Sequence, residues 1–315
     1  MKKKPMIGGQ AVIEGVMMKG PEKIATAVRE PSGEITVRVE SVHSISERYP
    51  IFKKPLLRGV IALGEALIYG LKALSFSAQA AGEEGEELST KEIALTMAAA
   101  FGLAVLLFVI VPTYAAKFIH SAVTDPRLLN LFEGVLRLGI FFAYVAAISS
   151  MADIRRVFQY HGAEHKTIFA YEAGIPLTVE NVRPFGRLHP RCGTNFLLIV
   201  MLVSIFMFAF LGWPALWLRI LSRVVMMPLV AGIAYDIIRF AGNHCDTPWV
   251  AFVMKPGLWL QYMTTREPSD DQIEVAIRAL ESVRPESETP PVESIVLPPA
   301  DGEVREEVAR EAASA

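Results

Sequence analysis

Residues 93 to 116 form an apolar stretch without a single charged side chain. About 20 consecutive apolar residues suffice to cross the hydrocarbon core of a bilayer as a helix, so this stretch predicts a transmembrane span. Three other apolar stretches with few charges predict the same: residues 128 to 151, 195 to 212 and 215 to 240. With 52% hydrophobic and 20% charged residues, the chain is too apolar for a typical soluble protein. We therefore expect a mostly α-helical, polytopic membrane protein with about four transmembrane helices between residues 93 and 240.

Two of these spans contain charges that need a partner or a route to water. Glu133 and Arg137 are four residues apart and can form an ion pair on one helix face. The last span carries charges near both ends, from which long side chains can reach the bilayer surface. These charges are Arg219, Arg223, Asp236 and Arg239.

The stretch from residue 55 to 76 is apolar but repeats a charge every seven residues, at Arg58, Glu65 and Lys72, which places all three on one helical face. This pattern favours an amphipathic or re-entrant helix within residues 51 to 81 over a helix that crosses the membrane. An arrangement with five spans, in which this stretch does cross, is the alternative.

Basic residues are concentrated in two segments that lie outside the predicted spans. Eleven lysines and arginines fall within residues 1 to 58, and six fall in the loop from 153 to 194. Because cytoplasmic loops of membrane proteins are enriched in these residues, we expect both segments and both termini to be cytoplasmic. No cleavable signal peptide is evident, since MKKK is followed by PMIGGQAVIEG and not by an apolar segment.

Residues 8 to 42 predict a small β unit within an N-terminal segment of residues 1 to 50. The apolar and β-branched runs QAVIEGVMM, KIATAVRE and EITVRVESV are separated by the turn sequences KGPE and EPSGE. We expect a three-stranded meander that packs against the basic central loop, because three strands alone are only marginally stable. Glu14 lies in the first run, and we expect it to face outward from a strand; a carboxylate that supports the ligands of the site is the alternative.

After the last span, residues 241 to 283 predict an interfacial segment with Trp249 and Trp259, followed by a helix over residues 269 to 283. The serine and two aspartates at its beginning are typical of a helix start. Residues 284 to 315 are rich in Pro, Glu and Ala and have no periodicity, which predicts a disordered acidic tail.

The segment YHGAEHKTIFAYE, residues 160 to 172, carries the strongest chemical signal. If the helix of the 128 to 151 stretch continues to Gly174, His161 and His165 lie one turn apart on the same face. Two neutral imidazoles at this spacing are good ligands for a metal ion. A solvated or hydrogen-bonded helix face is the alternative interpretation.

The motif also places a carboxylate beside the two histidines. H-x-x-E-H is the pattern of the inverted zincins, in which the histidines bind zinc and the glutamate acts as general base. Glu164 has that position in this chain. The pattern therefore predicts a divalent transition-metal site, with zinc as the ion and Glu164 as the catalytic base.

Further ligands can come from Glu172, which falls between the two histidines on the helix face, and from HPRCGTN at residues 189 to 195. His189 and Cys192 in that segment have a spacing at which both can contact one ion. Each has an alternative role: His189 can cap a turn, Cys192 can be a small buried residue, and Glu172 can pair with Lys166 or Arg183. The segment NHCDTP at residues 243 to 248, with His244, is expected on the same side. Cys192 and Cys245 are expected to stay reduced in the cytoplasm, without a disulfide.

Four segments of the chain together resemble a known family: GGQAVIEGVMMKGP, YHGAEHKTIFAYE, HPRCGTNF and GLWLQYMTTREPSDDQIEVAIRAL. They are similar to the YqhQ-like bacterial membrane proteins, a family labelled as predicted metal-dependent enzymes. The resemblance implies a protein of the bacterial cytoplasmic (inner) membrane with a metal site, and it transfers the motif of His161, Glu164 and His165. The chain departs from the inverted zincins because it re-enters the membrane some 30 residues later, which argues against a peptidase.

Two functions follow as hypotheses. The first is an integral membrane metalloenzyme that hydrolyses a lipid, a peptide or a small metabolite at the cytoplasmic face. The second is a non-catalytic membrane scaffold, assembly factor or transport-accessory protein. The expected partner is the lipid bilayer, while protein partners, a homo-oligomer among them, stay open. Nucleic acid is not an expected partner, because the formal net charge is −2 and the basic residues lie where the membrane topology requires them.

Overall fold

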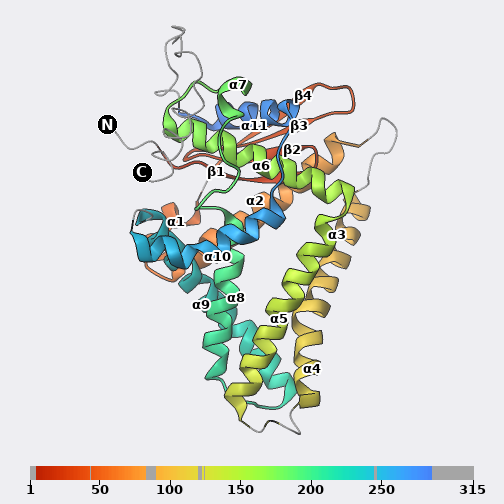
Figure 1. Cartoon of the computed structure of the whole chain (residues 1–315), viewed down its shortest axis with the longest axis vertical. Helices are drawn as coiled ribbons and strands as arrows, with labels where there is room; N and C mark the ends of the chain where they lie inside the picture. Colours follow the sequence, from red (N-terminus) through yellow and green to blue (C-terminus); the bar gives the residue numbers. More distant parts are fainter. Residues whose placement is uncertain are drawn as a thin grey trace.

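The computed structural model describes residues 5–42, 44–82, 90–119, 123, 125–244 and 247–285. The described chain has two parts (Figure 1): a head, in which helices lie over a small β-sheet, and a set of long apolar helices that extends away from it. Helix α10 (Pro248–Thr264) lies at the junction of the two parts, beside the head-side ends of two of the long helices. The predicted disordered tail falls almost entirely outside the described residues, as does Cys245.

The sheet has four antiparallel strands in the order β1-β2-β3-β4. Their bounds are Gly8–Val12, Gly15–Lys19, Lys23–Arg29 and Ile35–Ser41. The prediction of three strands is wrong because the run QAVIEGVMM does not continue as one strand. It reverses over Ile13 and Glu14, so that Val12 pairs with Gly15, and Glu14 has a positive φ of 50°. Glu14 is therefore a turn residue, and its carboxylate binds Arg156 and Tyr160 of the head instead of facing outward.

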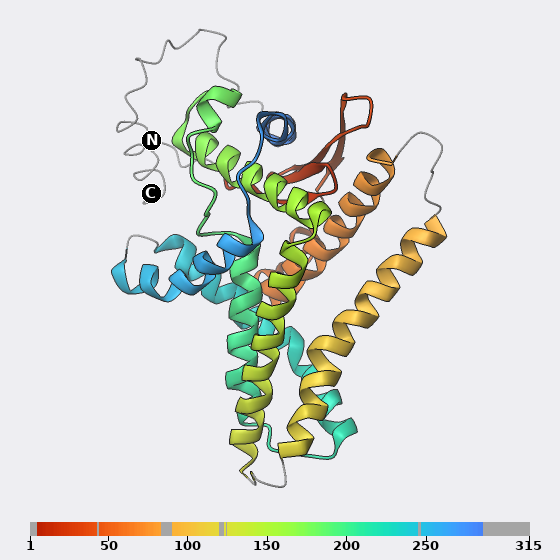
Figure 2. The same cartoon turned by 45° about the vertical axis from the view of Figure 1, so that its right-hand side comes forward.

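Helices cover both faces of this sheet, which explains why its strands are apolar on both sides. On one face, Val16 and Met18 pack against α6 (Ala152–Ala173) and α11 (Asp270–Val283). On the other face, Met17 and Val28 pack against α2 (Leu57–Ala80). Successive strand residues point to opposite faces, so one strand serves both cores. Figure 2 shows α11 end-on above the sheet and α2 below it. The N-terminal unit thus packs against the central basic segment, as expected.

The long apolar helices of the second part are α3, the π-helix η2, α4, α5, α8 and α9. Their bounds are Thr90–Val105, Leu106–Ile110, Val111–Ile119, Pro126–Ser149, Gly193–Ala209 and Leu216–Asn243. Among the described residues, four stretches are long and apolar enough to cross a membrane: Leu57–Ala80, Ala94–Ile119, Pro126–Ile148 and Leu216–Gly242. The expectation of a mostly helical, polytopic membrane protein is confirmed.

Three of these stretches coincide with predicted spans, and the fourth, Leu57–Ala80, takes the place of the predicted span at residues 195 to 212. Helix α8, predicted as a span, has 17 residues, whereas α2, predicted as amphipathic or re-entrant, has 24. Each of the three charges of α2 has a partner within the protein. Arg58 pairs with Asp236 of α9, Glu65 accepts hydrogen bonds from Ser44 and the Ile45 N–H, and Lys72 lies 3.8 Å from Glu40. The carboxyl-terminal half of α2 packs against the sheet.

The expected continuous helix from residue 128 to Gly174 is interrupted. Helix α5 ends at Ser149 and α6 begins at Ala152. The hydroxyls of Ser149 and Ser150 donate to the carbonyls of Ala146 and Ala147, so side chains occupy the last carbonyls of α5. Helix α6 ends at Gly174 as predicted, because Gly174 adopts the left-handed conformation at the cap. The remaining short elements are α1 (Ile45–Arg48), η1 (Pro50–Lys53) and α7 (Val179–Val182).

The charges inside the long helices form a buried cluster. Glu133 accepts hydrogen bonds from Arg137, as predicted, and also from Arg223 and Thr113. The expectation that Arg223 reaches the bilayer surface is wrong, because its guanidinium is buried against Glu133 and Asn130. Arg219 is also buried and stacks on the ring of Trp213. The carboxylate of Glu133, shared by Arg137 and Arg223, stabilises both guanidinium groups inside these helices.

Candidate metal centre

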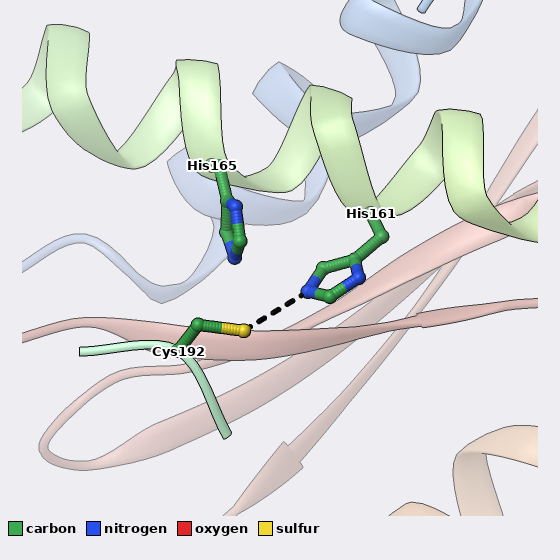
Figure 3. Close-up of side chains that lie close together, drawn as sticks. All are labelled: His161, His165 and Cys192. Atoms are coloured by element: carbon green, nitrogen blue, oxygen red, sulfur yellow. Dashed lines mark hydrogen bonds between the residues drawn. The ribbon is translucent and has the colours of Figure 1, made fainter. Parts of the chain in front are cut away.

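Three side chains from two distant segments converge at the base of the head. His161 and His165 lie one turn apart on α6, and Cys192 is the residue that caps the amino terminus of α8. One nitrogen of each histidine and the sulfur of Cys192 all lie within 4.8 Å of one another. Figure 3 shows the three side chains pointing toward a common point. Among the described residues, this is the group of histidine, cysteine and acidic side chains with spacing suited to a metal ion.

Backbone carbonyl groups fix the orientation of both histidine rings. Nδ1 of His161 lies 2.8 Å from the carbonyl oxygen of Thr264, and Nδ1 of His165 lies 2.6 Å from that of Arg187. A carbonyl oxygen can only accept a hydrogen bond, so Nδ1 of each ring carries the proton. Both Nε2 atoms therefore present a lone pair toward Cys192. Histidines that bind metals are commonly oriented by this kind of hydrogen bond.

Cys192 is buried and has the environment of a reactive thiol. Its sulfur lies 3.2 Å from Nε2 of His161 and accepts a hydrogen bond from the Thr194 N–H at the start of α8. Burial by itself raises the pKa of this thiol, but the imidazole of His165 and the two polar groups of Thr194 lower it by more, so the pKa falls below its usual value. The amino terminus of a helix also favours a negative charge. The lowered pKa makes it easier for the thiol to lose its proton and become a thiolate, the form in which cysteine binds metals.

The imidazole of His165 is buried, and the lone pair on its Nε2 is available to a ligand. The side chain of His165 is 1% exposed, and within the described residues its Nε2 has no nitrogen or oxygen partner, although the nearby sulfur of Cys192 interacts with the ring. Burial, followed by the neighbouring His161, lowers the pKa of His165, so the ring stays neutral. A buried acceptor without a partner is costly in a folded protein. Coordination of a metal ion would satisfy it.

Glu164 lies beside the three ligands, next to β1. It is 4% exposed, and its Oε2 has no hydrogen-bond partner in the described part of the chain. Burial raises the pKa of Glu164 to about 8, although His161 and the backbone N–H of Gly9 act in the opposite direction. Glu164 precedes His165 on α6, and its carboxyl group interacts electrostatically with His161 and Cys192. A carboxyl group with a pKa near neutrality is suited to exchange protons with a substrate.

The other predicted ligands do not join this cluster. Glu172 forms an ion pair with Arg191, and its second oxygen lies 3.7 Å from Nε2 of His189. His189 is buried and its ring stands beside those of His165 and Phe169. His244 stacks on Phe240 and binds the Phe240 carbonyl, within the end of α9. Lys166 and Arg183, the alternative partners of Glu172, instead pair with Glu267 and Asp270.

A buried amide holds the loop that carries Cys192. Gln261 of α10 accepts a hydrogen bond from the His189 N–H and donates to the His189 carbonyl and to Asn195. Asn195 in turn donates to the carbonyl of Pro190. These positioning residues, with Thr264, were not identified in the sequence, although Gln261 and Thr264 lie in the family-like segment GLWLQYMTTREPSDDQIEVAIRAL. Their polar side chains beside an apolar helix were the available signal.

The chain was compared with known proteins. A family model described as "Protein of unknown function (DUF1385)" matches residues 54–286. The chain is also 36% identical over 291 residues to the "Uncharacterized protein YqhQ" of Bacillus subtilis (strain 168), an overlap of 87% of this chain and 91% of that protein. No solved structure matches the chain. The chain belongs to the DUF1385 family, and the resemblance to YqhQ-like proteins is confirmed.

Proposed function

We propose that this member of the DUF1385 family is a membrane-embedded metal-dependent hydrolase whose ligands are His161, His165 and Cys192. One observation carries the proposal: both histidines are fixed by carbonyl groups at Nδ1, while Nε2 of His161 lies 3.2 Å from the cysteine sulfur and one nitrogen of each histidine lies within 4.8 Å of it. Packing alone does not require nitrogen lone pairs to converge on one point, whereas coordination of a metal ion does. The cost of leaving the Nε2 of His165 without a partner further supports an ion at this position.

The donor set fits zinc. Two imidazole nitrogens and one thiolate are ligands that zinc accepts, whereas magnesium and calcium prefer oxygen. Three protein ligands are the number found in catalytic zinc sites, which leave a position open, while structural sites are closed by four. Bound here, the ion would supply Lewis acidity, which lowers the pKa of water and polarises the bond to be cleaved. That Glu172 or His189 also binds the ion remains a prediction.

Glu164 is the proposed general base. Its free Oε2 can accept a proton from the attacking water and return it to the leaving group, so the carboxylate is regenerated in each turnover. The Gly9 N–H hydrogen-bonds to the carboxyl group and thereby restrains it beside the ligands. A cation next to this group would favour its ionised form, the form that a base requires at neutral pH.

The site is proposed to face the cytoplasm of a bacterial cell. The sheet and α6 belong to two segments of the chain that are rich in lysine and arginine, residues 1 to 58 and 153 to 194. Such segments stay on the cytoplasmic side of a bacterial inner membrane, and the cysteine of the site stays reduced there.

The test is the metal content of the full-length protein purified in detergent without chelator. We expect about one zinc ion per chain in the wild type, and loss of the ion in the His161→Ala/His165→Ala double variant. Glu164→Gln should retain the ion, because Glu164 is not a ligand, while any hydrolytic activity should disappear. His244→Ala is the matched control and should retain both the zinc ion and any hydrolytic activity.

A folded wild type that contains no transition metal and takes up none when zinc is supplied would contradict the proposal. The histidines would then serve the packing of a membrane scaffold.

A further inference from the structure

An apolar groove runs along the long helices below the candidate metal centre. It has a volume of about 430 Å³ and lies between α8, α9 and α10. Its walls include Leu198 and Leu202 from α8, Ile233 and Ile237 from α9, and Met254 and Gly257 from α10. Asn195 is its one polar lining residue. A volume of this size is typical of sites for small molecules.

The groove is open along its length to the surroundings of the helices. Leu202 is 47% exposed, Ile237 39% and Val253 58%, although all three are apolar and line it. Helix α9 is long and apolar enough to cross a membrane. The surroundings of such a helix are lipid tails, so an acyl chain can enter the groove sideways without crossing water.

The head-side end of the groove lies within one helical turn of a candidate metal ligand. The backbone N–H of Asn195 donates to the carbonyl oxygen of Cys192 at 3.1 Å. The side chain of Asn195 also contacts Gln261, which holds the loop of His189 and Cys192. The polar end of a molecule whose tail lies in the groove is therefore directed toward the metal centre.

Helix α10 marks the level at which a bilayer would change from tails to headgroups. It lies beside the head-side ends of α8 and α9, and its rings Trp249, Phe252, Trp259 and Tyr262 are each more than half exposed. Lys255 is the charged residue on this helix. Tryptophan and tyrosine concentrate at the two surfaces of membranes. The groove lies on the tail side of this level, and the site lies on the headgroup side.

From this arrangement we propose that the substrate is a bilayer lipid whose acyl chain occupies the groove between α8, α9 and α10 while its headgroup region reaches His161, His165 and Cys192. The inference rests on the proposed hydrolytic function and specifies its substrate class. One water is consumed in the reaction: its hydroxyl adds to the acyl or phosphoryl centre of the cleaved ester, and its proton passes through Glu164 to the departing oxygen. A water-soluble peptide would not occupy an apolar groove that faces lipid tails.

The test is photo-crosslinking of the full-length protein in vesicles of phosphatidylethanolamine and phosphatidylglycerol. Two probes are used, one with a diazirine within an acyl chain and one with a diazirine on the headgroup. We expect the chain probe to label peptides of α8, α9 and α10 that line the groove, above the background at Phe118 of α4, which is also exposed. We expect the headgroup probe to label the segment around His189 and Cys192.

Variants make the test specific to the groove. Ile233→Trp should reduce groove labelling by about tenfold, since a bulky side chain fills the space for the chain. Leu202→Trp tests the opposite wall at a half-exposed position that tolerates a larger side chain. Val225→Trp is the matched control for Ile233→Trp, because Val225 also lies on α9, is 65% exposed and lies outside the groove. Its labelling should equal that of the wild type.

Metal content, measured on the same samples, separates the two proposals. Labelling spread evenly over all exposed helix faces, or headgroup labelling away from His189 and Cys192, overturns the lipid inference even when zinc is bound. Labelling confined to the groove in a protein that binds no metal overturns the hydrolase, and with it the claim that the bound lipid is a substrate.

Discussion

Nε2 of His161 lies 3.2 Å from the sulfur of Cys192, although the two residues are 31 positions apart in the chain. The contact joins the middle of α6 to the start of α8. Because Nδ1 of His161 donates to Thr264, the thiol is the hydrogen-bond donor to Nε2 in the metal-free protein. A metal ion that binds between these atoms replaces that proton, so metal binding should release it.

The first prediction concerns the sulfur ligand. In protein loaded with Co²⁺, we expect a sulfur-to-cobalt charge-transfer band that is absent from Cys192→Ser. The serine variant should also bind zinc more weakly, because a hydroxyl is a poorer ligand than a thiolate for this ion. The measurement is the absorption spectrum during cobalt titration, with His244→Ala as a control that keeps the band. An unchanged band in Cys192→Ser would exclude Cys192 as a ligand.

The second prediction concerns the amide that positions the loop. Gln261→Met keeps the size of the side chain but removes the hydrogen bonds to both backbone groups of His189 and to Asn195. We expect zinc affinity to fall by roughly 10- to 100-fold, the usual effect of losing a group that supports metal ligands. Competition with a chelator of known affinity measures this change.

Gln159→Met is the matched control for Gln261, since Gln159 accepts a hydrogen bond from Gln272 in the head, away from the ligands. It should leave zinc affinity unchanged. Equal losses in both variants would indicate a general loss of structure and not a role for Gln261 at the site.

The third prediction concerns Gly162, where the connection between α10 and α11 crosses α6. A methyl group at this position would overlap the carbonyl oxygen of Arg266, a backbone atom that cannot turn aside. Gly162→Ala should therefore lower the free energy of unfolding by about 1–3 kcal/mol, the usual cost of overpacking. It should also weaken zinc binding, because the displaced segment adjoins Thr264, whose carbonyl orients His161.

Gly139→Ala in α5 provides the comparison for Gly162, since a methyl group there meets no atom within 4 Å. Alanine is a better helix former than glycine, so this variant should be as stable as the wild type or more so. Thermal unfolding in detergent checks both variants. A Gly162→Ala protein as stable as Gly139→Ala would contradict the close crossing.

The sequence predicted the elements of this fold better than the connections between them. Apolar stretches without charges identified most of the long helices, and Gly174 identified the end of α6. The breaks were missed because they depend on side chains that bind the local backbone, as Ser149 and Ser150 do at the end of α5. The turn at Glu14 was missed because a glutamate with positive φ is uncommon, and its contact with Arg156 bridges distant segments.

The candidate site was predicted only in part, because some of its residues are brought together by contacts between distant segments. His161, Glu164 and His165 are near one another because of helical periodicity, which a sequence reveals. Periodicity also placed Glu172 with them, but Arg191 holds that carboxylate beside His189 instead. The approach of Cys192 and the role of Gln261 depend on how α8 and α10 pack against the head, and no local pattern encodes that packing.

The last prediction concerns the buried charge cluster of the long helices. Glu133 is 1% exposed and is the acidic partner of both Arg137 and Arg223. Glu133→Ala leaves the buried Arg223 and the partly buried Arg137 without a carboxylate, so the free energy of unfolding should fall by roughly 3–5 kcal/mol, the range for breaking a buried ion pair. Adding Arg223→Leu removes one unpaired charge, and the double variant should regain part of the loss. The measurement is unfolding in mixed detergent micelles, compared with Glu40→Ala, whose surface ion pairs should contribute no more than about 1 kcal/mol. If Glu133→Ala is no less stable than Glu40→Ala, then the cluster does not hold these helices together. If it is less stable but still binds zinc as the wild type does, the cluster and the metal centre are independent, as their separation into different parts of the fold implies.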